Sequence, residues 1–206
     1  MLDAYPHRCG DEETDLRVSG AWAAAAALIA AIPAAALAQA ADPVARIAAY
    51  DDAVIGVAKA KLGLAARIQR FEPVVRAYYD LPAIAALVVG PGWATASAAD
   101  RAAAIAALGH HSAVSLARNF DGYDGTRFVV DPKPIDRAGS QIVKVTIGSD
   151  VLFYRMRQSA DTWRIVDVIS GGVSQLALQR ADLAGTVRTG GIAAMVKRLG
   201  QLDAVK

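Results

Sequence analysis

TWRIVDVISGGVSQLALQRADLAGTVRTGGIAAMVKRL, residues 162–199, joins a strand-like half to a helical half. Its β-branched and aromatic run, 163–169, predicts a strand that ends at Gly171-Gly172. The apolar spacing after this break predicts an amphipathic helix, and Gly190-Gly191 separates it from one more helix. No reactive group stands out in the stretch. Its apolar side chains are arranged to enclose a ligand, which favours a binding function over catalysis.

Outward from this stretch, the second half of the chain predicts a meander of short antiparallel strands. Tight turns at Gly148-Ser149-Asp150 and Ala160-Asp161 separate runs that alternate or are rich in β-branched residues. We expect strands at 126–130, 141–148, 151–157 and 162–170.

The first half predicts helices. Asp42, Asp80 and Ser97 are expected N-caps, and Pro73 is a candidate break within the second helix. The predicted helical segments are 42–66, 64–79, 81–89 and 98–120. Because helices precede strands, we predict an α+β fold: an N-terminal helical layer packed on a curved antiparallel four-stranded sheet, with C-terminal helices.

Residues 1–40 have the pattern of a secretory signal peptide. An apolar run, 21–37, is followed by Ala38-Gln39-Ala40, which fits the small-x-small cleavage rule. The alternative is a retained membrane anchor. The segment before the run is acidic instead of basic, so we expect translation to begin near Arg17 or Val18. Residues 41–206 then form a single domain.

Charge and cysteine content exclude some classes of function. Residues 1–40 hold two of the 22 basic and five of the 20 acidic residues, which leaves about +5 on the remainder. The basic residues are scattered without aromatic interleaving, so we predict no nucleic-acid partner. Cys9, the single cysteine, lies in the leader, so the remainder has no thiol, disulfide or cysteine metal site.

Candidate catalytic groups are few. His110 and His111 are adjacent in a predicted helix and point about 100° apart, so we interpret them as a half-exposed polar pair and not as a metal clamp. Glu72 is the single glutamate after the leader. The acid pairs Asp51-Asp52 and Asp121-Asp124 are expected at the surface or in turns. The sequence therefore predicts no catalytic residue, no metal and no cofactor.

Asp167 is the one acid in a strongly apolar strand. We expect Ile165 and Ile169 on its own face, and an ion pair with Arg155 or Arg157 on the adjacent strand. A working acid or base at this position is the alternative. The basic residues of the strands are expected on solvated faces and not in a substrate clamp: Lys144, Arg155, Arg157 and Arg164.

Order and spacing along the chain resemble a known family. The residues on which the resemblance rests are Asp80-Leu81, Val89-Gly90 with Trp93, Ser97 with Asp100-Arg101, Tyr123 with Gly125, Tyr154 to Arg157, Trp163 with Asp167-Val168, and Gly172-Val173-Ser174. Together they are similar to the periplasmic toluene-tolerance or MlaC family of lipid-binding proteins. Phe120 to Tyr123 and Tyr154 to Arg157 look closest to its hopanoid-associated branch, HpnM.

The resemblance implies a periplasmic lipid carrier, with residues 41–206 as one lipid-binding domain. It implies a pocket for a phospholipid or hopanoid, transient contact with an inner-membrane transporter component, and no catalytic residue. By position the pocket residues would be Trp93, Leu152, Tyr154, Met156, Val168, Val173 and Leu176. Periodicity alone does not separate such a pocket from an ordinary core.

Two other functions remain open from the residues. The first is a small isomerase or dehydratase on a cone-shaped α+β fold, with Asp167 as base and Tyr154 or Tyr123 as electrophilic donor. It requires Asp167 to point, unpaired, into a cavity. The second is an interaction module for a membrane complex, which would have a filled core and an exposed apolar patch.

Overall fold

A computed structural model describes residues 42–204. The predicted signal peptide, 1–40, lies outside the described residues. The helices are α2 (Pro43–Lys59), α3 (Leu64–Tyr78), α4 (Leu81–Val89), the short 3-10 helix η1 (Gly90–Trp93), α5 (Ala98–Asn119) and α6 (Gln175–Ala204). The strands are β1 (Phe128–Val130), β2 (Ile135–Arg137), β3 (Ser140–Ile147), β4 (Asp150–Ser159), β5 (Thr162–Ser170) and β6 (Val173–Ser174).

The predicted N-caps are confirmed. The carboxylate of Asp42 accepts hydrogen bonds from the first backbone N–H groups of α2, and that of Asp80 accepts one from Ala83 in α4. Ser97 Oγ accepts from the backbone N–H of Asp100 at 3.0 Å. Each cap satisfies a donor that has no partner inside its own helix, which fixes where the helix begins.

Two helix boundaries differ from the prediction. The first helix ends at Lys59 and not near residue 66, because Lys61 adopts a positive φ of 48° and Gly63 is the N-cap of the next helix. Pro73 does not break α3, which continues through it to Tyr78. An internal proline removes one backbone hydrogen bond, and packing of the buried face outweighs that loss here.

The sheet is antiparallel throughout, in the order β1-β3-β4-β5-β6, with β2 also paired to β3. The α+β prediction is confirmed, and the four expected strands are present. The two additional strands, β2 and β6, have three and two residues, too few for alternation to show in a sequence. β6 follows the Gly171-Gly172 turn, in which both glycines have positive φ, and it pairs with the end of β5.

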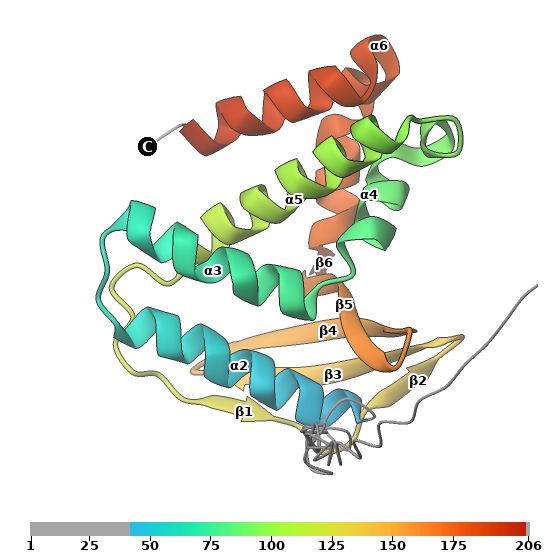
Figure 1. The fold of residues 1–206 in the computed structure, drawn as a ribbon. Coiled ribbons are helices and arrows are strands. Elements are labelled where there is room, and N and C mark those ends of the chain that lie inside the picture. Colours follow the sequence, from blue (N-terminus) through green and yellow to red (C-terminus); the bar gives the residue numbers. More distant parts are fainter. Residues whose placement is uncertain (1–41, 205–206) are drawn as a thin grey trace, which may run out of the picture. The chain divides into compact units, whose positions relative to one another are not determined.

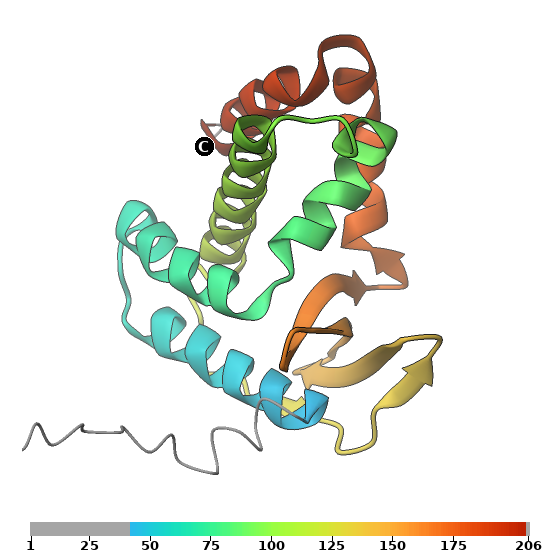
Figure 2. The same cartoon turned by 45° about the vertical axis from the view of Figure 1, so that its right-hand side comes forward.

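The helices stack in layers over one face of the sheet (Figure 1). α2 contacts β1 and β3, α3 packs on α2, and α5 packs on α3. α6 leaves the sheet at β6 and contacts α4, then bends at Gly191 so that its last part lies along α5 (Figure 2). No helix in residues 42–204 has the length and hydropathy needed to cross a membrane.

The buried side chains form two clusters. The first joins α2, α3 and α5 to the sheet and includes Tyr50, Phe71 and Met156. The second joins α4, α5 and α6 and includes Ile84, Leu183 and Leu199. Between the clusters the packing is incomplete, and this is where the candidate site lies.

Candidate functional site

A cavity of about 560 Å³ lies where the two clusters meet. α2, α4, α5, α6 and the inner face of strands β3 to β5 all contribute to its wall. Most of its lining is apolar or aromatic: Tyr50, Val54, Tyr79, Ile84, Leu116, Phe120, Ile147, Leu152, Tyr154, Val166, Val168, Leu176, Leu178, Leu183, Leu199 and Leu202. Its size is in the range of pockets that enclose a small ligand.

One side of the cavity is polar. It is built from facing residues of α5 and α6 and from the strand ends: His111, Ser112, Ser115, Asn119, Asp150, Asp167, Ser170, Gln175, Gln179 and Asp182. Ser112, Ser115 and Asn119 of α5 are spaced by three and four residues, so they share a helix face. The cavity therefore suits an amphiphile, a molecule with a long apolar part and a polar end.

Four of the seven pocket residues named from sequence line this cavity. Leu152 and Tyr154 share the inner face of β4, and Tyr154 is the cross-strand partner of Val168 on β5. Leu176 adds a wall from the first turn of α6. The period-2 pattern of the strands brings these side chains together.

The other three lie elsewhere. Met156 is completely buried in the first cluster, where it faces its cross-strand partner Ile165. Trp93 packs against the second cluster with the Arg101 guanidinium 5.6 Å from its ring centroid. Val173 is 50% exposed in β6 and does not line the cavity. The alternation of side chains along β4 predicts on which face of the sheet Met156 lies. It does not predict whether a helix fills the space above that side chain.

Sequence reasoning missed the contributions of α2 and of the polar face of α5. Ser112, Ser115 and Asn119 look like ordinary solvent-facing residues in a helical pattern. The spacing of three to four residues was the available signal, but it marks a shared face without saying what that face meets.

Three tyrosines from separate elements form part of the wall. The hydroxyls of Tyr50 and Tyr79 are 3.1 Å apart, and the ring of Tyr50 meets that of Tyr154 edge to face, with centroids 5.6 Å apart. Burial raises the pKa of Tyr79 to about 12, and it raises the pKa values of Tyr50 and Tyr154 well above their usual range. All three are neutral phenols, so they present ring surface and hydroxyls to the cavity and no anion.

Asp51 corrects a sequence expectation. Asp52 is exposed as predicted, but Asp51 is 3% exposed, and neither carboxylate oxygen has a hydrogen-bond partner in the described structure. Burial, with a smaller effect of the neighbouring Asp52 charge, raises the Asp51 pKa to about 7. Asp51 lies four residues after Ile47 and three before Val54, so the helical period places it in the buried stripe of α2.

The carboxylate of Asp167 is fully engaged. One oxygen accepts the hydroxyl of Ser174 at 2.7 Å and lies 3.4 Å from Nη2 of Arg155, while the other accepts the backbone N–H of Leu176 at 3.0 Å. The predicted ion pair is confirmed with Arg155, the cross-strand partner. Asp167 also stabilises the start of α6, since an anion there faces the free N–H groups of the helix. It is not the unpaired base that the enzyme alternative requires.

A β-bulge at Val166 explains one wrong expectation about this strand. Arg155 pairs with Asp167, whereas the next residue, Met156, pairs with Ile165. The extra residue puts Ile165 on the face of Met156 and leaves Asp167 on the face of Arg155, so the two do not share a face as predicted.

Two arginines of the strands also contact the helical layer. Nε of Arg157 lies 3.3 Å from the carboxylate of Asp80, and Nη1 of Arg164 donates to backbone carbonyls at the end of α3, including that of Ala77 at 3.3 Å. These contacts tie the outer part of the sheet to the helical layer. Arg157, whose side chain is 51% exposed, lies on a solvated face as predicted. It and Arg164 also make these contacts because the end of α3 and the start of α4 lie beside the strands.

The two histidines bind separate carboxylates. Nδ1 of His110 lies 2.9 Å from Glu72, and Nδ1 of His111 lies 2.6 Å from Asp203. Their side chains are 48% and 22% exposed, which confirms the half-exposed polar pair. Within residues 42–204 no group of three or more histidine, cysteine or acidic residues has a metal-holding arrangement.

The fold is found in other proteins. It is similar to that of the phospholipid-binding protein from Ralstonia solanacearum, whose structure was solved in complex with a phospholipid. The TM-score is 0.69 at 16% sequence identity, and the match covers 80% of this chain and 98% of the Ralstonia chain. No curated protein matches the sequence significantly. The model of the family described as MlaC protein matches residues 49–201, and the chain belongs to this MlaC family.

Proposed function

We propose that this protein is a periplasmic lipid carrier that holds the hydrocarbon part of a lipid in the cavity between its helices and its sheet. The observation that carries the proposal is the cavity itself, which opens between two packed clusters and is walled mainly by apolar side chains. Each buried CH₂ group contributes about 0.8 kcal/mol, so such a wall retains a long chain without a specific polar clamp.

Family membership supports the same function. MlaC proteins are periplasmic, and the Ralstonia protein with this fold binds a phospholipid. We propose that this chain receives and delivers lipid through transient contacts with membrane transport components, one of them an inner-membrane transporter. The ligand is a phospholipid or, as the likeness of Phe120 to Tyr123 and Tyr154 to Arg157 to the HpnM branch suggests, a hopanoid.

The two alternatives are supported less well. An enzyme that uses Asp167 as base needs a free carboxylate, and three groups occupy the one present. The neutral phenol of Tyr154 has no such base beside it to complete an acid–base pair. An interaction module would have a filled core, and the cavity argues against that. A binding protein without chemistry accounts for all three observations.

The proposal is tested by lipid extraction and mass spectrometry of the full chain purified from the periplasm. We expect co-purified lipid in the wild type. Ser115→Trp places a large ring in the cavity from α5, and it should lower the bound lipid several-fold. Ala106→Trp, at an exposed position of the same helix, is the matched control and should keep its lipid. A lipid-free wild type, or equal lipid in both variants, contradicts the proposal.

A further inference from the structure

A second hollow lies on the other side of the first half of α6. This groove, of about 460 Å³, runs between α6 and α4. Its apolar wall comes from Leu87 of α4 and from small side chains of α6, such as Ala177 and Ala184. Its charged wall comes from Arg155 of β4 and Arg180 of α6. No carboxylate lines it, so the described groove is apolar on one side and cationic on the other.

α6 separates this groove from the cavity. Successive residues of a helix turn by about 100°, so Ala177, Arg180 and Ala184 share the face toward the groove while Gln179 and Leu183 face the cavity. Leu176 lines both hollows. One side chain in the first turn of α6 therefore stands between the apolar cavity and the two arginines.

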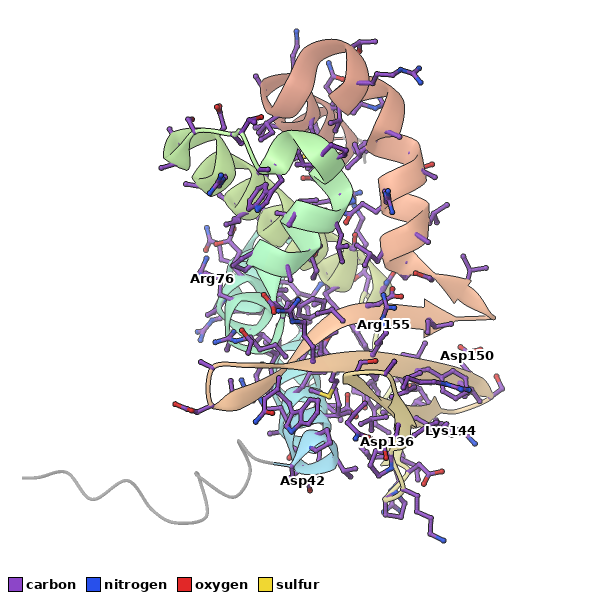
Figure 3. The ribbon with its side chains drawn as sticks, turned by 90° about the vertical axis from the view of Figure 1, so that its right-hand side faces the viewer. Asp42, Arg76, Asp136, Lys144, Asp150 and Arg155 are labelled. Carbon is purple, nitrogen blue, oxygen red and sulfur yellow. The ribbon has the colours of Figure 1, made fainter. Side chains whose placement is uncertain are left out.

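Arg155 keeps most of its hydrogen-bonding capacity. Figure 3 shows it between the sheet and the start of α6. One nitrogen, Nη2, lies 3.4 Å from Asp167, and Nε is buried without a hydrogen-bond partner in the described structure. The side chain as a whole is 38% exposed. The charge of Asp167 is also shared with Ser174 and with the backbone N–H of Leu176. Arg155 therefore has free donors and an incompletely balanced charge.

Arg180 adds a second guanidinium. It is exposed, and within residues 42–204 it makes no ion pair. Guanidinium groups bind phosphate oxygens through two parallel hydrogen bonds, which makes arginine the preferred partner of that anion. An apolar wall lowers the local dielectric and strengthens the attraction. The chemistry of the groove matches one phosphate attached to an apolar molecule.

We propose that Arg155 and Arg180 bind the phosphate of a lipid headgroup whose hydrocarbon chains occupy the cavity across Leu176. The inference rests on the proposed carrier function and names the ligand class: a phosphate-bearing lipid, in preference to an uncharged hopanoid. The cavity retains the chains whatever the headgroup, and the arginine pair adds selection for phosphate.

The test compares two ligands with identical acyl chains. Phosphatidylglycerol carries the phosphate and diacylglycerol lacks it, and both are presented from cyclodextrin to the delipidated full chain. We expect the wild type to bind phosphatidylglycerol at least roughly tenfold more tightly, as the loss of a charged hydrogen bond implies. Arg180→Gln should remove this preference while leaving diacylglycerol affinity unchanged, and Arg180→Lys should restore part of it. Arg188→Gln, an exposed arginine of α6 outside both hollows, should behave as the wild type.

The remaining outcomes overturn different claims. Equal binding of the two lipids, unchanged by Arg180→Gln, overturns the headgroup site and leaves the carrier function standing. Binding of neither lipid overturns the carrier function itself. A third arm uses inorganic phosphate alone. Saturable phosphate binding that depends on Arg180, with equal affinity for the two lipids, assigns the arginines to a free anion and also overturns the headgroup site.

Discussion

Nδ1 of His111 lies 2.6 Å from Oδ1 of Asp203, which joins the middle of α5 to the last turn of α6. The backbone carbonyl of Asp203 also accepts a hydrogen bond from Arg118 at 2.8 Å. Leu199 and Leu202, in the same turns of α6, line the cavity. The contact therefore fixes the segment that closes one side of the candidate lipid site.

Replacing Asp203 by Asn should loosen this segment. The substitution removes the charge that His111 faces in a mostly buried contact, and we expect a loss of about 1–2 kcal/mol in the free energy of unfolding. Hydrogen exchange should speed up in residues 192–204 in particular. Glu72→Gln, which alters the more exposed contact with His110, is the control and should change stability by under about 0.5 kcal/mol. Equal losses in the two variants would show that the Asp203 contact has no special role.

The buried carboxyl group of Asp51 should lower the free energy of unfolding as pH rises. Its folded pKa of about 7 lies above the usual value of 3.8, so the folded state retains a proton that the unfolded chain releases first. The stability associated with Asp51 is fully present below about pH 4 and is lost as pH rises through 7. The difference reaches at most about 4 kcal/mol.

Asp51→Asn tests this dependence by urea unfolding between pH 4 and pH 8. The variant should be close to the wild type at pH 4 and more stable by about 2–4 kcal/mol at pH 8. Asp52→Asn, at the exposed neighbouring position, should not show this change with pH. A stability difference for Asp51→Asn that stays constant over the range would rule out the buried, uncompensated carboxylate.

The bend in α6 predicts opposite effects at two glycines of one helix. A Cβ at Gly190 would lie 2.6 Å from Cβ of Ala194, next to the non-helical backbone of Gly191. We expect Gly190→Ala to lower the free energy of unfolding by about 1–3 kcal/mol. Gly185 has nothing within 4 Å of a built Cβ, so Gly185→Ala should stabilise by about 0.5–1 kcal/mol. Denaturant unfolding of the two variants gives both signs, and a gain at Gly190 would contradict the strained bend.

How far the sequence predicts this molecule depends on the range of each interaction. Asp42 and Asp80 were identified as caps because a cap is decided within three or four residues. The Arg155–Asp167 ion pair could be predicted because tight turns fix which strands are neighbours. Asp51 was misplaced because an Asp-Asp pair looks solvated in sequence, whereas its position in the helical period relative to Ile47 buries it.

The sequence did not predict the tertiary features of the site, and the reason is physical. The bulge at Val166 changes which face Ile165 occupies, and no residue type in that run signals it. The cavity is a gap between two clusters, so it depends on how helices far apart in sequence pack. Strand alternation placed Tyr154 and Met156 on one face correctly, but one lines the cavity and the other is enclosed by α2 and α3 side chains of the first cluster.

Leu152 and Met156 test this division between site and core, because they share one strand face. Met156 is fully buried, so Met156→Ala should lower the free energy of unfolding by about 2–5 kcal/mol. Leu152 is partly exposed to the cavity, where removing side-chain atoms enlarges an existing space, so Leu152→Ala should cost less, about 1 kcal/mol. Leu152→Ala should change the chain-length profile of co-purified lipid, and Met156→Ala should leave that profile unchanged in the folded fraction. Mass spectrometry of extracted lipid, beside urea unfolding, measures both effects. A shifted profile in Met156→Ala would place that side chain in the site, because core packing alone does not select among chain lengths.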